Sequence, residues 1–120
     1  MTTPKPALEC SFPIPVRRDA ELSDGEPHPR AAWRWLERVL FEKFEGGTRA
    51  PGLYWGFYRS DSGKKVIDAS HKYFVALPKS KLGQLRSLLF EVCEVFAQKC
   101  VYLSVAGQVE LVVRKKHGPA

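Results

Sequence analysis

The sequence has few of the residues that build metal centres, disulfide frameworks or catalytic motifs. Its 120 residues include only three cysteines and three histidines, and no two cysteines have CxxC spacing. An odd number of cysteines without that spacing argues against a disulfide framework and against a zinc site. A Walker loop, a GxSxG motif and an HExxH motif are also missing. We therefore expect Cys10, Cys93 and Cys100 to be free thiols, and we expect no metal and no cofactor.

Long apolar runs are missing too. No segment approaches the roughly 18 apolar residues that cross a bilayer, and the opening Met-Thr-Thr-Pro-Lys-Pro has no run of signal-peptide type. We expect a cytoplasmic protein without a membrane partner. The length predicts a single domain over 1–120, with loose termini at 1–9 and 114–120. The net charge of +6 favours anionic partners, although a charge of this size also serves solubility.

Hydrophobic alternation predicts the first strand. Phe12, Ile14 and Val16 share one parity, while Pro13 and Pro15 occupy the other. Proline has no N–H to donate, so this segment is expected to be an edge strand or to pair along only one side.

Two apolar stripes with spacings of three and four residues predict helices over 33–44 and 82–96. The remaining strands are predicted at residues 53–59, 64–67, 71–77, 100–105 and 109–113, where the last either continues its predecessor or pairs separately. The order β-α-β-β-α-β is that of the ferredoxin-like split β-α-β arrangement, with both helices on one face of an antiparallel sheet. The alternative is a less regular α+β sandwich in which 109–113 pairs elsewhere.

The segment 52–60 carries the clearest strand pattern. Leu53, Trp55 and Phe57 fall on one face, which we expect the helices to cover. The other face is tyrosine with a glycine gap, and a second predicted strand adds polar and aromatic residues to it. The predicted binding surface on this open face consists of Tyr54, Gly56, Tyr58, Tyr102 and Ser104.

These features favour a non-enzymatic interaction module that acts through the open face, by self-association or by docking on another protein. Aromatic residues are enriched at such interfaces. One alternative is nucleic-acid binding, with bases stacked on the tyrosines, although the glycine-aromatic motif of RNA-recognition domains is missing. The basic residues that would contact an anion are Arg17, Arg18, Lys64, Lys65, Lys72, Arg114, Lys115 and Lys116.

A second alternative is a small-ligand enzyme of dimeric α+β barrel type. His71 lies near Asp68 in the sequence, and the tyrosines would line the pocket with them. General acid–base catalysis depends on hydrogen-bond geometry, which a three-residue spacing does not establish. The acidic residues of loop 17–27 are expected to be solvated; they are Asp19, Glu21, Asp24 and Glu26.

Two segments carry a family resemblance. Cys-Ser-Phe-Pro-Ile-Pro-Val-Arg-Arg-Asp at 10–19 and the stretch from Val95 to Leu111 resemble small uncharacterised bacterial proteins with a single α+β domain. That group has no assigned activity, so the resemblance implies a bacterial, cytosolic, single-domain protein and transfers no catalytic residue.

Overall fold

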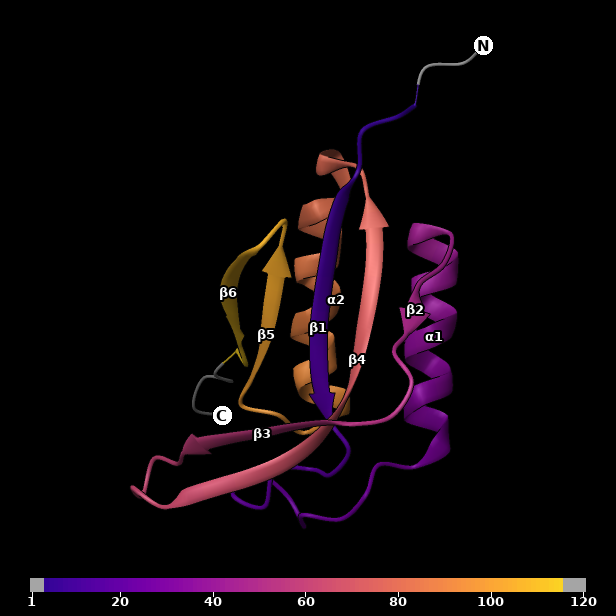
Figure 1. Ribbon diagram of the computed structural model, residues 1–120. Coiled ribbons are helices and arrows are strands. Elements are labelled where there is room, and N and C mark those ends of the chain that lie inside the picture. The colour runs from indigo at the N-terminus through magenta and orange to yellow at the C-terminus, as the bar shows by residue number, and fades with distance from the viewer. Residues whose placement is uncertain (1–3, 116–120) are drawn as a thin grey trace.

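The computed structural model describes residues 4–115, which form one mixed α+β unit (Figure 1). The strands are β1 (Leu8–Pro15), β2 (Thr48–Arg49), β3 (Tyr54–Arg59), β4 (Lys65–Leu77), β5 (Cys100–Val105) and β6 (Gln108–Val113). The helices are α1 (Arg30–Phe44) and α2 (Leu82–Val95), the latter preceded by the 3-10 turn η1 (Lys79–Lys81). No helix in the described part of the chain is long and apolar enough to span a membrane.

All six strands belong to one antiparallel sheet. Its order is β2-β4-β1-β5-β6, and β3 pairs with the first half of β4. Ser70 pairs with Pro15 on one side and with Tyr54 on the other, so β1 and β3 occupy opposite edges of β4.

The simple ferredoxin-like split β-α-β arrangement predicted from the sequence is therefore wrong. The chain after α1 contributes two strands instead of one, because Pro51 lacks an N–H and Gly52 adopts a positive φ of 75° between β2 and β3. Residues 108–113 add a sixth strand, β6, which folds back on β5 through a turn at Ala106 and Gly107. The sheet thus has six strands in place of the four of the β-α-β-β-α-β arrangement, and residues 108–113 pair as a separate strand.

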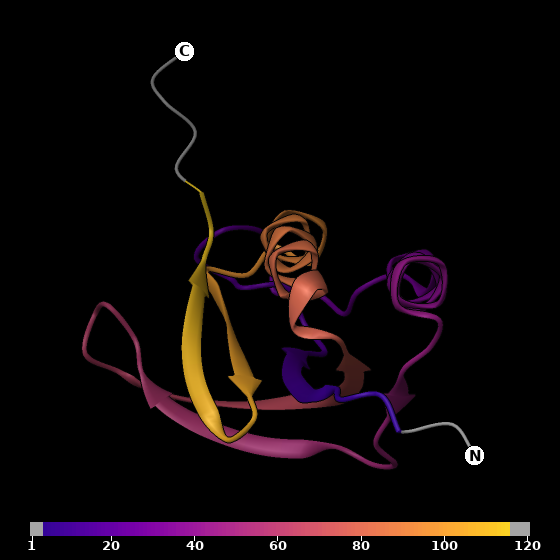
Figure 2. The same ribbon diagram turned by 90° about the horizontal axis from the view of Figure 1, so that it is seen from above.

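The core lies between the sheet and the two helices, which pack on the same side of it (Figure 2). Phe12 and Ile14 of β1 and Tyr73 of β4 are fully buried there, beneath Leu36 of α1 and Leu89 of α2. The Tyr73 hydroxyl donates a hydrogen bond to Glu37 of α1 at 2.7 Å, which satisfies its polar end. Burial on this side fixes the register, since a slip of one residue would turn each strand over.

The β3–β4 ribbon, residues 54–69, extends beyond this cover. Figure 1 shows β3 and the first half of β4 running clear of both helices. Trp55 and Phe57 lie on the same side of the sheet as the helices, opposite Ala69 and Ile67, but they are 72% and 77% exposed. The expectation that helices cover Leu53, Trp55 and Phe57 is therefore wrong. Strand parity correctly placed Trp55 and Phe57 on the helix side of the sheet, but neither helix extends far enough to bury their side chains.

His28 makes the stability of the fold dependent on pH. Its ring is buried, donates from Nε2 to the Pro15 carbonyl at 2.8 Å, and meets the Phe96 ring edge-on at 4.8 Å. The bare Nδ1 has no partner among the described residues, and burial lowers the pKa of His28 below 6.5. Below that pH the unfolded chain binds more protons than the folded chain, so acidification lowers the free energy of unfolding.

We therefore expect the melting temperature to fall as the pH is lowered from about 7.5 to about 5, and the His28→Gln variant to show a shallower fall. Thermal unfolding followed by circular dichroism checks this. A variant with the wild-type slope would show that His28 is not the group responsible.

Candidate functional site

A cavity forms where β1 and β5 separate. Glu9 accepts a hydrogen bond from the backbone N–H of Ala106, so the odd residues of β1 direct their backbone groups toward β5. Pairing of the two strands stops after Ser11, because Pro13 and Pro15 have no N–H to continue it. The register, extended past this point, would set the two prolines opposite Tyr102 and Cys100. All four of these residues line the cavity instead.

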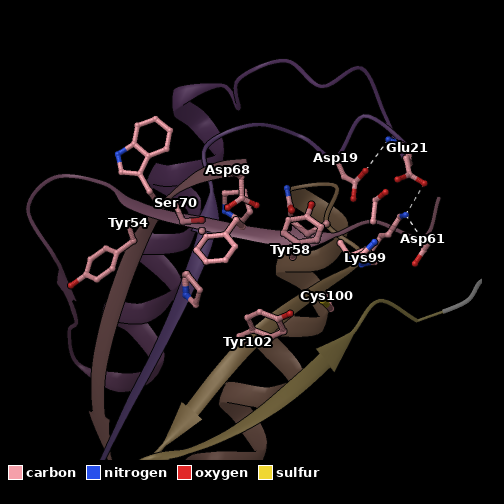
Figure 3. Close-up of a pocket in the computed structure, with 18 of the residues that line it drawn as sticks. Asp19, Glu21, Tyr54, Tyr58, Asp61, Asp68, Ser70, Lys99, Cys100 and Tyr102 are labelled. Carbon is pink, nitrogen blue, oxygen red and sulfur yellow. Dashed lines mark hydrogen bonds and ion pairs between the residues drawn. The ribbon is translucent and has the colours of Figure 1, made fainter. Parts of the chain in front are cut away.

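The cavity has a volume of about 480 Å³ and is bounded by three parts of the chain. β5 forms one wall, the ribbon forms the other, and the loop after β1 closes one end (Figure 3). Tyr54 and Tyr58 project from β3 and Tyr102 from β5, while on β4 Ser70 lies opposite Tyr54 and Asp68 lies between the two tyrosines of β3. The volume lies within the range of small-molecule sites, about 300–1,000 Å³.

Asp68 is the distinctive polar group in this cavity. It is half-buried, and burial, the sole cause, raises the pKa of its carboxyl group above 3.8. Among the described residues its carboxylate has no hydrogen bond and no ion pair. The space in front of it depends on Gly56, its partner across the ribbon, because a Cβ there would lie 3.2 Å from Asp68 Oδ1. Burial and the nearby Asp68 also raise the pKa of Tyr58.

Lys99 links the ribbon to the loop that follows β1. Its Nζ lies 2.9 Å from Asp61 Oδ2 at the tip of the ribbon and 3.0 Å from Glu21 Oε2 in the loop after β1 (Figure 3). Hydrogen bonds to these two carboxylates raise the pKa of Lys99, and the bond to Asp61 has the larger effect. The loop itself is fixed separately, since the Gln98 amide donates to the Arg17 carbonyl at 2.9 Å. Because the loop is held by this other hydrogen bond, the ion pairs of Lys99 serve chiefly to hold the ribbon in position.

Four residues of the predicted binding surface meet in this cavity: Tyr54, Gly56, Tyr58 and Tyr102. Ser104 does not line it, because it lies farther along β5, where it pairs with Ser11. His71 is on the opposite side of the sheet from Asp68, with its ring 4.9 Å from that of Trp33. An odd separation along a strand sends two side chains to opposite faces, so Asp68 and His71 are not brought together.

The basic residues do not gather at one place. Lys72 lies over the Tyr54 ring at 5.1 Å, and Lys65 over the Phe57 ring at 5.6 Å, on the other face of the ribbon. Arg18 pairs with Asp24 at 2.7 Å. At the far end of the chain, Arg114 pairs with Glu94 and Lys115 lies over the Phe90 ring. Arg17 and Lys64 are exposed, and Lys116 lies outside the described residues.

Sequence reasoning missed several residues of the cavity: Asp19, Glu21, Asp61, Ser70, Lys99 and Cys100. Asp68, Ser70 and Lys72 share one parity of β4, which would have indicated a polar face on that strand. The signal was lost because residues 64–67 and 71–77 were predicted as two strands, whereas β4 is continuous over Lys65–Leu77. The ion pairs of Lys99 carried no comparable signal, since they join segments 38 and 78 residues apart.

Removing the charge of Lys99 is expected to loosen the ribbon. Exposed ion pairs are weak, so Lys99→Met should leave the melting temperature nearly unchanged while hydrogen exchange at the amides of β3 speeds up roughly two- to fivefold. Lys64→Met, an exposed lysine on the turn of the same ribbon, is the control. Exchange rates in Lys99→Met equal to those of wild type would contradict this role.

Comparison with known proteins adds one finding. No protein-family model matches the chain, and no curated protein matches it. Among solved structures, the chain is similar to a phage SAM lyase in complex with S-methyl-5'-thioadenosine. The TM-score is 0.63, the sequences are 16% identical, and the likeness covers 87% of this chain and 84% of that chain. At this identity the likeness establishes a shared fold.

Proposed function

We propose that this protein is an enzyme that cleaves S-adenosylmethionine, or a closely related sulfonium nucleoside, in the cavity between β5 and the ribbon. The non-enzymatic interaction module predicted from the sequence is set aside as wrong, because the solved structure that shares the fold over 87% of the chain is a lyase. A small-ligand enzyme, the alternative weighed at that stage, is better supported. His71 has no part in the proposal, since it lies against Trp33 on the far side of the sheet.

The observation that carries the proposal is the composition of the cavity. A volume of about 480 Å³ accommodates a nucleoside with a short side chain. Tyr58 and Tyr102 offer aromatic rings that suit stacking with a purine and contact with a sulfonium cation. Tyr54 is already engaged with the ammonium group of Lys72. The walls thus match the two ends of such a substrate, a flat base and a soft cation.

The chemistry is the breaking of the bond between the sulfonium sulfur and the γ carbon of the amino-acid side chain. The electron pair of that bond goes to sulfur, so the cation becomes a neutral thioether and leaves as S-methyl-5'-thioadenosine, while the carboxylate oxygen of the same substrate bonds to the γ carbon and closes a five-membered lactone. A site that withholds water weakens the solvation of the cation more than that of the neutral product, and this favours cleavage. The rings of Tyr58 and Tyr102 are 44% and 51% exposed, so the substrate itself would have to cover them to withhold water from the reacting bond.

The charge change also constrains the role of Asp68. A carboxylate placed against the sulfur would stabilise the cationic substrate more than the transition state, and so would slow the reaction. Asp68 serves better as an acceptor for the hydroxyl groups of the ribose, whose charge does not change. Its carboxylate is available for this, because no described residue donates to it.

Asp68→Asn is expected to lower kcat/KM by about 10- to 100-fold, the effect of losing a charge-assisted hydrogen bond. The measurement is chromatographic detection of S-methyl-5'-thioadenosine formed from S-adenosylmethionine. The matched control is Glu91→Gln on the exposed surface of α2, which should retain full activity. Absence of product from the wild-type protein, or full activity in Asp68→Asn, would refute the proposal.

The melting temperature of the same variant shows whether it folds, because it should not fall when the activity does. Because burial raises the pKa of Asp68, its folded-state stabilisation is complete below pH 3.8 and is lost as the pH rises through the folded pKa. Asp68→Asn should therefore have a melting temperature at pH 7 equal to or above that of the wild type. A large fall would assign the lost activity to misfolding.

A further inference from the structure

Asp19 is held at the closed end of the cavity by hydrogen bonds from its own loop. Its backbone N–H donates to the Ala97 carbonyl at 2.9 Å, and its carbonyl accepts from the N–H groups of Leu22 and Ser23 at 3.0 and 2.8 Å. Its side-chain Oδ1 accepts from the Glu21 N–H at 2.8 Å. These bonds fix a half-buried carboxylate that lines the cavity, and they do so independently of a ligand.

The carboxylate of Asp19 has no cationic partner among residues 4–115. The neighbouring Arg18 pairs with Asp24 instead, at 2.7 Å. Lys99, which lines the same end of the cavity, is already held by two other carboxylates. This end of the cavity therefore carries an excess of negative charge, and the Oδ2 atom of Asp19 is left without a hydrogen bond to any described residue.

Asp19 lies near both walls of the cavity. Burial raises the pKa of Cys100 on β5, and the negative charge of Asp19 adds to this effect. Burial and the charges of Asp68 and Asp19 raise the pKa of Tyr58 on β3. In Figure 3, Tyr58 stands between Asp68 and Asp19. A ligand with its ribose on Asp68 can therefore extend one end past Tyr58 to Asp19.

We propose that Asp19 binds the α-ammonium group of the substrate, and that the site recognises the amino-acid end of its substrate by this group and not by the carboxylate. The inference rests on the proposed function, since it sets the amino-acid chain of a sulfonium nucleoside beside Asp19. A carboxylate without a cation offers the ammonium group a charge-assisted hydrogen bond. The product S-methyl-5'-thioadenosine has no ammonium group, so Asp19 favours the substrate and does not hold this product.

The cations that line the cavity are engaged elsewhere, which leaves the substrate carboxylate free. Lys99 is held by its two ion pairs. Lys72 lies over the ring of Tyr54 at 5.1 Å. Arg59 donates to the Gly63 carbonyl at 3.2 Å. The substrate carboxylate is the nucleophile that closes the lactone, and a cation bound to it would stabilise the substrate more than the transition state. An ammonium group held by a carboxylate instead fixes the α carbon, keeps its proton, and lets the substrate carboxylate fold back on the γ carbon.

Calorimetric titration with two uncleaved thioethers isolates this contact from the reaction. S-adenosylhomocysteine carries the ammonium group, whereas S-methyl-5'-thioadenosine lacks it. Asp19→Asn should weaken binding of the first by about tenfold, the effect of losing a hydrogen bond between charged groups, and should leave binding of the second unchanged. Asparagine keeps the Oδ1 that accepts from the Glu21 N–H, so the loop is retained. The matched control is Asp24→Asn, which accepts from the Glu26 N–H in the same loop, does not line the cavity, and should alter neither affinity.

A third probe separates the ammonium group from the carboxylate. The adenosine thioether with a 3-aminopropyl chain keeps the first and lacks the second, so it should bind as S-adenosylhomocysteine does and lose the same factor in Asp19→Asn. Unchanged affinity of Asp19→Asn for both amines, or an equal loss for S-methyl-5'-thioadenosine, would overturn the role of Asp19.

The outcome for the reaction is read separately. A wild-type protein that forms no S-methyl-5'-thioadenosine from S-adenosylmethionine refutes the proposed cleavage, and the affinities for the two amines still decide the ammonium contact. A wild-type protein that binds none of the three thioethers overturns both.

Discussion

The missing N–H groups of Pro13 and Pro15 are the constraint on which the site depends. In the middle of a sheet, a strand pairs on both edges, and β1 is such a strand by its position between β4 and β5. Its two prolines remove the donors on the β5 edge only, so pairing with β4 runs the full length of β1 while pairing with β5 covers two residues. The sheet stays intact on one edge of β1 and opens on the other, and the cavity occupies the opening.

The end of β1 explains why the ribbon stands free beside the cavity. β1 ends at Pro15, opposite Ser70, so the first half of β4 has no strand on that edge and only β3 pairs with it. A two-stranded ribbon has little stability of its own. Its position is therefore sensitive to single contacts at its tip, and the contact of Lys99 with Asp61 is of that kind. A wall held this way can admit a ligand without disturbing the core.

Much of the fold's local structure could be predicted from sequence, because helical stripes and strand alternation are local signals. The parity of Tyr54, Gly56 and Tyr58 placed them on one face, and the prolines of β1 indicated pairing along one side. The sequence does not show how far the helices extend over the sheet. Trp55 and Phe57 have the pattern of core residues, yet they lie beyond the ends of the helices. The continuity of β4 and the ion pairs of Lys99 depend on long-range packing, which no local pattern encodes.

Two features of this molecule lower its stability without helping it to fold. Asp68 is half-buried with no partner among the described residues, and burial of an unpaired carboxylate costs free energy whenever it is charged. The exposed aromatic face of the ribbon carries a comparable cost, because large apolar side chains are left in water. These two features lie on opposite faces of the same ribbon, with Asp68 on the face of Tyr54 and Tyr58, while Trp55 and Phe57 are on the other face and also contribute to the lining of the cavity. A ribbon with an unpaired carboxylate on one face and bare aromatics on the other is costly to maintain, and the first cost is relieved when a ligand donates hydrogen bonds to Asp68.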